Sequence, residues 1–237
     1  MNGRRISYAR RRLAALLPAV PLLAAGGCAS TPAPAPPGGE PLPPPRLTVG
    51  ERWRYALTNL YNGGALGEAT VEVLALAPEI RLAVLLPGAS APLEERYADA
   101  WTVIAEAVFD RPITYETPMP LVPPGARAGQ ASASSTTYRA EGTSRRLGWQ
   151  QRWRALGWER ATVPAGTFDT LRIERLVSFE HPDTFRFDPF RRDVLWYAPA
   201  AGRWVRREWT GDFMSGGPTP MSGRSLEERV RWELLRA

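Results

Sequence analysis

Few side chains in this sequence could do chemistry, and they are far apart along the chain. Cys28 is the only cysteine and His181 the only histidine in 237 residues. Metal sites are mostly built from clusters of cysteine and histidine, so no metal is expected. There is no phosphate-binding loop and no dinucleotide fingerprint either. The sequence therefore predicts no cofactor.

Catalysis by a serine nucleophile is also disfavoured. His181 precedes Pro182, which favours extended backbone, and we expect it to be a surface residue in a loop. No G-x-S-x-G elbow is present. An enzyme of this sequence would have to use carboxylates that converge within about 5–10 Å, as in glycoside chemistry. That alternative, a carboxylate-dependent periplasmic hydrolase, would draw on Asp169, Asp183, Asp188 and Asp212.

The thiol of Cys28 has a more informative context. Five arginines and no acidic residue precede it, and residues 13–25 are apolar or small. A charged start, a short apolar run and small residues before a cleavage site are typical of a secretory signal peptide. The run is shorter than the roughly 20 residues that a membrane-spanning helix needs. We therefore interpret residues 1–27 as a signal peptide.

The segment Ala25-Gly26-Gly27-Cys28 resembles the bacterial lipobox, although alanine replaces the usual leucine at its first position. The resemblance implies that Cys28 receives diacylglycerol and becomes the new N-terminus. Acyl chains such as palmitate contribute about 0.8 kcal/mol per buried methylene, enough for stable anchoring. The alternatives are a secreted protein with one unpaired thiol, or a buried cysteine. Ala29, in place of aspartate, favours the outer membrane, facing the periplasm, under enterobacterial sorting rules.

The charge of the chain depends on this signal. The full sequence has 30 basic and 24 acidic residues, a net charge of +6, and every basic residue is arginine. Without residues 1–27 there would be 25 basic and 24 acidic residues, a net charge of +1. Because nucleic-acid binding normally requires a strongly basic domain or stripe, no nucleic-acid partner is expected.

Residues 28–45 are interpreted as the lipidated cysteine followed by a linker. Eight prolines occur between positions 29 and 45, which is typical of a semi-rigid spacer. The alternative is a proline-rich ligand for the groove of a partner protein. Residues 46–237 are long enough to bury one core and are predicted to form a single β domain.

The domain begins with patterns typical of strands. In residues 51–61 aromatic and aliphatic side chains alternate with arginine and threonine, and Asn62-Gly63-Gly64 predicts a hairpin turn. Residues 68–76 and 80–86 continue as strands. Residues 92–108 could form an amphipathic helix, but Thr102-Val103-Ile104 is β-branched and favours strands. Later strands are predicted at 148–158, 161–180, 192–213 and 227–235, and residues 129–138 as a polar edge strand or loop.

Two later segments carry a resemblance to a family. Residues 163–174, "VPAGTFDTLRIE", and 196–208, "WYAPAAGRWVRRE", are similar to the V-P-A-G-x-F and W-Y-A-P-x-x-G motifs of a family of uncharacterised bacterial envelope lipoproteins. The resemblance implies a curved β-sheet and no defined catalytic residue. The first motif is also consistent with a type I turn, because Pro164 and Gly166 suit its second and fourth positions, and Pro199 to Gly202 are predicted to close a hairpin.

We therefore predict an all-β, mainly antiparallel domain that forms a strongly curved sheet or incomplete barrel, with one short helix at most. The predicted function is a membrane-anchored, non-enzymatic envelope module that binds a hydrophobic ligand or scaffolds another component. A lipid, glycan or envelope protein would be its partner. The candidate ligand face consists of Trp53, Tyr55, Trp153, Trp196 and Trp209.

Overall fold

Twelve antiparallel strands form one closed barrel in the computed structural model, which describes residues 39–109, 111–215 and 224–237. Each strand pairs with its neighbours in the sequence, and β1 pairs with β12 to close the ring. The strands are β1 (Arg52–Asn59), β2 (Ala65–Ala75), β3 (Ile80–Leu85), β4 (Leu93–Tyr97), β5 (Thr102–Glu106), β6 (Ile113–Pro120), β7 (Ala131–Ala140), β8 (Leu147–Val163), β9 (Gly166–Phe179), β10 (Arg186–Ala198), β11 (Arg203–Ser215) and β12 (Arg224–Arg236). The predicted all-β class is confirmed. The prediction was a strongly curved sheet or an incomplete barrel, and the structure shows a closed barrel.

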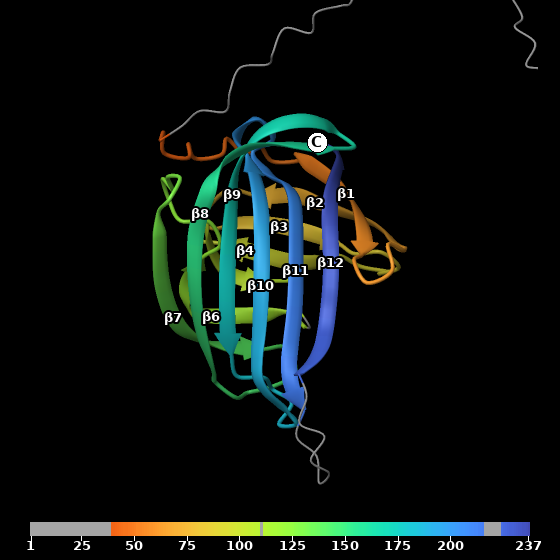
Figure 1. Cartoon of the computed structure of the whole chain (residues 1–237), viewed down its shortest axis with the longest axis vertical. Coiled ribbons are helices and arrows are strands. Elements are labelled where there is room, and N and C mark those ends of the chain that lie inside the picture. Colours follow the sequence, from red (N-terminus) through yellow and green to blue (C-terminus); the bar gives the residue numbers. More distant parts are fainter. Residues whose placement is uncertain (1–38, 110, 216–223) are drawn as a thin grey trace, which may run out of the picture. The chain divides into compact units, whose positions relative to one another are not determined.

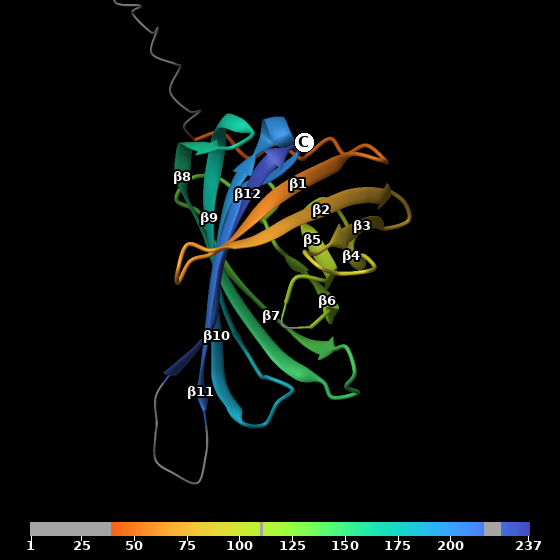
Figure 2. The same ribbon diagram turned by 90° about the vertical axis from the view of Figure 1, so that its right-hand side faces the viewer.

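The wall of the barrel is uneven in height. Strands β8 to β12 are long and stand side by side as a tall sheet, whereas β3 to β5 are short and cover the opposite side (Figures 1 and 2). β8 has 17 residues and β4 has 5. The space enclosed by both sides contains one continuous hydrophobic core.

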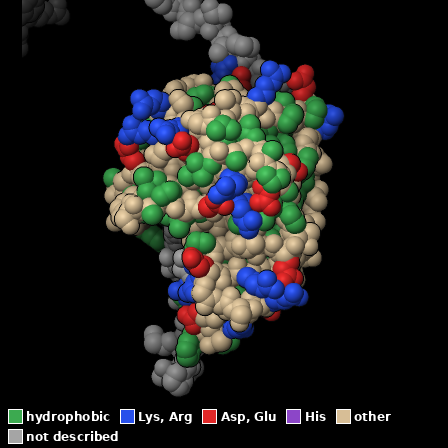
Figure 3. Space-filling model, turned by 180° about the vertical axis from the view of Figure 1, so that it is seen from behind, with side chains coloured by type: hydrophobic (Ala, Val, Ile, Leu, Met, Phe, Trp, Pro, Cys, Tyr) green, Lys and Arg blue, Asp and Glu red, His purple; other side chains and the backbone are tan. Residues whose placement is uncertain are grey.

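Side-chain alternation decides what fills this core. In β1 the side chains of Trp53, Tyr55 and Leu57 are buried, while Arg52 and Arg54 point outward and pair with Glu72 and Glu68 on β2. Successive side chains of a strand point to opposite faces of the sheet. Every second residue of a strand therefore points into the barrel, and the residues between them face the solvent. On the face formed by β2 to β6, basic and acidic side chains are interspersed (Figure 3).

The predicted turns are confirmed. Asn59 and Gly64 close the β1–β2 hairpin through a backbone hydrogen bond of 2.8 Å. Val163 pairs with Gly166 across the V-P-A-G turn. In the W-Y-A-P-x-x-G segment a 3₁₀ turn, η1 (Pro199–Ala201), joins β10 to β11. It ends at Gly202, whose φ of 63° lies in the left-handed region that glycine adopts without a Cβ clash.

The segment 92–108 forms two strands, β4 and β5, as the β-branched residues favoured. The connection between them is held by Asp99, whose carboxylate accepts hydrogen bonds from the backbone N–H groups of Trp101 and Thr102 at 2.8 and 2.9 Å. This Asx turn reverses the chain between the two strands.

Residues 39–50, here called the N-terminal strap, cross the upper mouth of the barrel (Figure 1). Leu42 is buried, and its N–H donates to the carbonyl of Ala126 at 2.8 Å. Within the predicted linker 28–45, Leu42 is buried against the barrel because its side chain is apolar, while Pro41, Pro43 and Pro44 are exposed. The predicted signal peptide, Cys28 and the rest of the linker lie outside the described residues.

Among the helices of the described residues, none has the length and apolarity needed to cross a membrane.

Candidate functional site

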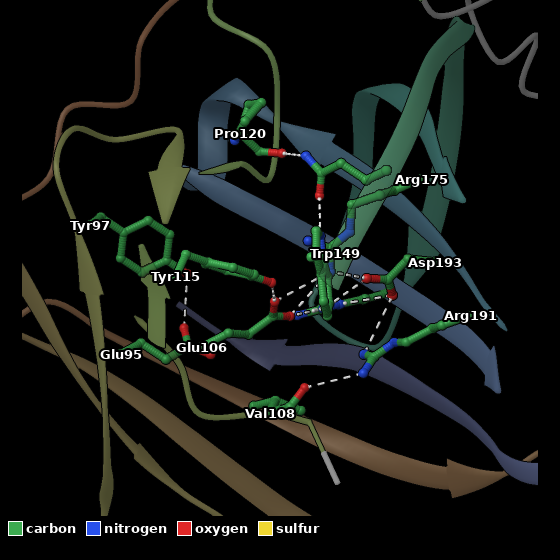
Figure 4. Close-up of polar contacts among 12 residues, drawn as sticks. Glu95, Tyr97, Glu106, Val108, Tyr115, Pro120, Trp149, Arg175, Arg191 and Asp193 are labelled. Carbon is green, nitrogen blue, oxygen red and sulfur yellow. Dashed lines mark hydrogen bonds and ion pairs between the residues drawn. The ribbon is translucent and has the colours of Figure 1, made fainter. Parts of the chain in front are cut away.

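Ionised side chains lie buried in the middle of the barrel. The guanidinium of Arg175 contacts Asp193 Oδ2 at 2.7 Å and Glu106 Oε1 at 3.1 Å. Arg207 contacts the same two oxygen atoms, each at 2.8 Å. None of these four side chains is more than 3% exposed. Figure 4 shows the two carboxylates converging from opposite sides of the barrel. We call these four residues the buried charge network.

The strand pattern explains why charged groups lie inside. Arg175 shares the inward phase of β9 with Ile173 and Val177, both fully buried. On β10 and β11, Asp193 and Arg207 occupy the same inward phase. Glu106 ends β5 on the opposite side of the barrel. Closure of the sheet therefore brings the carboxylate of Glu106 on β5 into contact with Arg175 on β9 and Arg207 on β11.

The network keeps its carboxylates ionised. Burial opposes the charge of Glu106, but the positive charges of Arg175, Arg207 and Arg191 outweigh it and lower its pKa to about 2. The same competition holds the pKa of Asp193 well below its ordinary value. Tyr115 donates its hydroxyl to Glu106 Oε2 at 3.1 Å, and burial raises the pKa of this phenol. Neither carboxylic acid holds a proton at neutral pH, so neither can serve as a general acid there.

These shifts predict how stability depends on pH. The pKa of Glu106 lies below its ordinary value of 4.5, so its contribution to folding is fully present above pH 4.5 and is lost as the pH falls toward 2. We expect the melting temperature to decrease across this window. Glu106→Gln should be less stable than the wild type at neutral pH, and the difference between the two should shrink with acidification, because a protonated glutamate is as neutral as glutamine. Circular dichroism melts at each pH test this. A constant difference between the two proteins would contradict the assignment.

A second buried pair lies nearer the strap. Arg203 Nη2 is 3.5 Å from Glu95 Oε2, which also accepts the hydroxyl of Tyr97 at 2.8 Å. The guanidinium of Arg203 lies over the rings of Trp53 and Trp204, at 5.5 and 5.0 Å from their centroids. Aromatic faces attract cations in this arrangement.

Among the described residues, the buried arginines outnumber the buried carboxylates. The arginines 175, 191, 203 and 207 face three carboxylates, those of Glu95, Glu106 and Asp193. Arg191 has the weakest carboxylate contact, 3.8 Å from Asp193 Oδ1. Its guanidinium lies between Phe109 and Trp209, 4.8 and 4.9 Å from the ring centroids. Aromatic rings thus accommodate the excess positive charge.

Little empty space remains around these groups. A cavity of about 40 Å³ lies between the strap and the upper core, lined among others by Leu47, Trp53, Trp101, Tyr197 and Arg203. That volume holds about three water molecules. Drug-sized ligands occupy about 300 Å³ or more. The barrel interior is therefore essentially filled by its own side chains.

The residues of the candidate ligand face are divided by the structure. Trp53, Tyr55, Trp153 and Trp209 lie on the inner side of the wall and are packed in the core. Trp196 lies on the outer side. Its indole N–H donates to Glu159, and the guanidinium groups of Arg172 and Arg206 cover its ring at 5.1 and 5.4 Å. Of the five, only Trp53 lines the small cavity.

His181 requires a correction. It lies between β9 and β10, in a loop as expected, but it is 6% exposed and was predicted to be a surface residue. Its ring packs beside that of Phe179, and its Nδ1 accepts the N–H of Asp183 at 2.9 Å.

The four aspartates of the hydrolase alternative do not come together. Asp169 lies on β9 close to the V-P-A-G turn, exposed and paired with Arg160 at 3.3 Å. Asp183, Asp188 and Asp212 lie toward the other end of the barrel, in the β9–β10 connection and the adjoining parts of β10 and β11. In the part of the chain that the structure describes, no group of three or more acidic, histidine or cysteine side chains could hold a metal ion.

Sequence reasoning missed the buried charges, because it assigned arginine to the outer face. A signal was present: Arg175, Asp193 and Arg207 each occupy the apolar phase of a strand, flanked two positions away by residues such as Ile173, Leu195 and Val205. A charge in that phase predicts an internal partner, but the sequence does not say which one.

No protein-family model matches the sequence, and no curated protein matches it either. Solved structures that are similar over most of the chain include the following three. A protein assigned as a lipoprotein from Parabacteroides distasonis has 13% identity and a TM-score of 0.49, with 84% of this chain and 99% of that one covered. An exported protein with a YmcC-like fold from Bacteroides fragilis has 14% identity and a TM-score of 0.46, covering 84% and 98%. The hypothetical lipoprotein YmcC from Escherichia coli has 11% identity and a TM-score of 0.40, covering 78% and 84%.

Proposed function

We propose that this chain is a lipid-anchored, non-enzymatic module of the bacterial cell envelope that holds a partner protein on the outer surface of its barrel. The anchor would be diacylglycerol on Cys28, which follows an arginine-rich start and a short apolar run. Ala29 favours the outer membrane, with the domain facing the periplasm. The motifs at 163–174 and 196–208 remain a prediction of family membership.

The filled interior carries this proposal. A binding barrel such as a lipocalin keeps a ligand cavity inside its wall, whereas here the largest aromatic residues and the buried charge network occupy that space. The cavity beneath the strap, about 40 Å³, is too small for an acyl chain or a sugar ring. A partner is therefore expected to bind outside the barrel, which favours scaffolding over binding of a hydrophobic ligand.

The hydrolase alternative has less support. Among the described residues, the carboxylates of Glu106 and Asp193 converge, but both are buried and share the same two guanidinium groups. A glycosidase needs one carboxylic acid with a raised pKa and access for the substrate. In Glu106 and Asp193 both pKa values are lowered.

In-cell photo-crosslinking tests the proposal. A photoreactive amino acid would replace, one at a time, the exposed residues Leu74, Leu156 and Phe185, which lie on different parts of the barrel. We expect a protein adduct from at least one position of the full-length chain, and loss of that adduct in a Cys28→Ser background, which no longer holds the domain at the membrane. The absence of protein adducts at all surface positions would overturn the proposed function.

A further inference from the structure

The barrel is closed, but the ladder between β6 and β7 covers only one end of these two strands. These two strands pair only over Ile113–Tyr115 with Tyr138–Ala140, although β6 continues to Pro120 and β7 begins at Ala131. Pro118 and Pro120 explain the divergence, because proline lacks the N–H that a ladder requires. Beyond Tyr115 the two strands therefore separate, as Figure 2 shows.

The separation leaves an edge of β7 without a partner strand. Ala155 N–H donates to the carbonyl of Gln130, so in the antiparallel ladder with β8 the backbone groups of residues 132, 134 and 136 point toward β8. Those of Ala131, Ala133 and Ser135 point toward β6. Within the described part of the chain, these three residues make no backbone hydrogen bond on that side.

Side-chain hydrogen bonds span the gap between β6 and β7 but leave the backbone edge of β7 uncovered. The side-chain amide of Gln151 donates to the carbonyl of Pro120 at 2.7 Å. Near the paired end, Thr117 N–H donates to Thr136 Oγ1 at 3.0 Å, and Thr137 donates to Glu116 at 2.8 Å. Gln151 is 1% exposed, so the core is sealed there. The free edge therefore faces the outside of the barrel.

The edge also lacks the usual protection against pairing. Natural edge strands carry charged side chains, proline or bulges that prevent a further strand from adding. β6 has this protection in Pro118 and Pro120, whereas residues 131–136 of β7, "ASASST", contain no charge and no proline. An added strand could thus pair with β7 but not with β6.

The outer face beside the edge is hollowed and basic. Two adjoining hollows of about 490 and 530 Å³ share Ala133, Arg152 and Leu176 in their linings. Arg154 and Glu174 also line the second hollow. Arg152 makes no ion pair with any described residue, and Arg154 is 61% exposed, with its nearest carboxylate, Glu174, at 3.9 Å. Both positive charges are available to an acidic occupant.

From these features we infer that the free edge of β7 binds an extended, acidic segment of a partner protein, which adds to the sheet as a further strand. This deepens, and depends on, the proposed docking function. Backbone hydrogen bonds to residues 131, 133 and 135 would hold the segment, and Arg152 and Arg154 would select its acidic side chains. The chain's own residues 29–38 are a poor occupant, because four of those ten residues are proline.

The test is photo-crosslinking from Ala133 in the full-length anchored protein, with Ala83 on β3 as the matched control position. Ala83 lies in a strand that is paired on both sides. We expect a protein adduct from Ala133 and none from Ala83, and mass spectrometry should locate the adduct in an acidic, extended segment of another protein. Ser135→Pro removes one N–H that points to the edge, and Arg152→Glu reverses one charge. Each is expected to lower the adduct yield about 10-fold.

The possible outcomes distinguish a failure of the β7 inference from a failure of the proposed function. If Ser135→Pro fails to fold, Arg152→Glu still tests the charge requirement, because its side chain is on the outer face. An adduct with a second copy of this chain, or no adduct from Ala133, overturns the inference. If adducts form from Leu74, Leu156 or Phe185 but not from Ala133, docking occurs elsewhere and the proposed function survives. If no surface position gives a protein adduct, both fail.

Discussion

Asp193→Asn is expected to lower the free energy of unfolding by about 3–5 kcal/mol. The substitution is nearly isosteric, so little packing changes, but it removes a charge that Arg175 and Arg207 both contact inside the core. Two buried guanidinium groups would then share Glu106 alone. In a domain of this size the melting temperature should fall by about 6–20 °C. Urea unfolding followed by tryptophan fluorescence measures the change directly.

The matched control is Asp169→Asn. It removes the same charge from an exposed ion pair with Arg160, in which Asp169 is 43% exposed, and should cost less than about 1 kcal/mol. A double-mutant cycle sharpens the test. Arg207→Met added to Asp193→Asn removes the excess positive charge, so the double variant should be more stable than the sum of the two single changes predicts. Equal effects of Asp193→Asn and Asp169→Asn would refute the structural role of the network.

Cys28→Ser is expected to release the protein from the membrane completely. An acyl anchor contributes many buried methylenes at about 0.8 kcal/mol each, and nothing in the near-neutral charge of the mature chain replaces that energy. After cell lysis and a high-salt wash, the wild-type chain should remain in the membrane fraction and the variant should be soluble. Ala29→Ser is the control, since it leaves the thiol in place. Retention of Cys28→Ser in washed membranes would contradict lipidation.

Local sequence signals predicted the fold well where they act over a few residues. Asn62-Gly63-Gly64, Pro164 and Gly202 set backbone angles that admit few alternatives, and the turns at these positions are confirmed. The alternation in β1 likewise predicted which side chains are buried. In residues 92–108 the helical spacing was misleading by itself, and the β-branched run Thr102-Val103-Ile104 was the better guide.

The interior could not be predicted in the same way. Arg175 meets Glu106 across 69 residues of sequence, and Arg207 meets it across 101. Such pairs form only when the barrel closes. The alternation of residues within one strand cannot predict which strands the closed barrel brings together. The period-two rule also treats arginine as a solvent-facing residue, whereas Arg191 and Arg203 are buried against aromatic rings. The unpaired edge of β7 is a similar case, since it depends on the prolines of β6 and on how far the two strands diverge.

Native mass spectrometry of the full-length protein, extracted from membranes in mild detergent, can detect both the lipid on Cys28 and any ligand held in the barrel. We expect a single species with the mass of residues 28–237 plus the acyl groups on Cys28, and no additional small molecule, because the barrel has no room for one. A stoichiometric lipid or glycan bound to the folded chain, or an unmodified thiol at Cys28, would contradict this expectation.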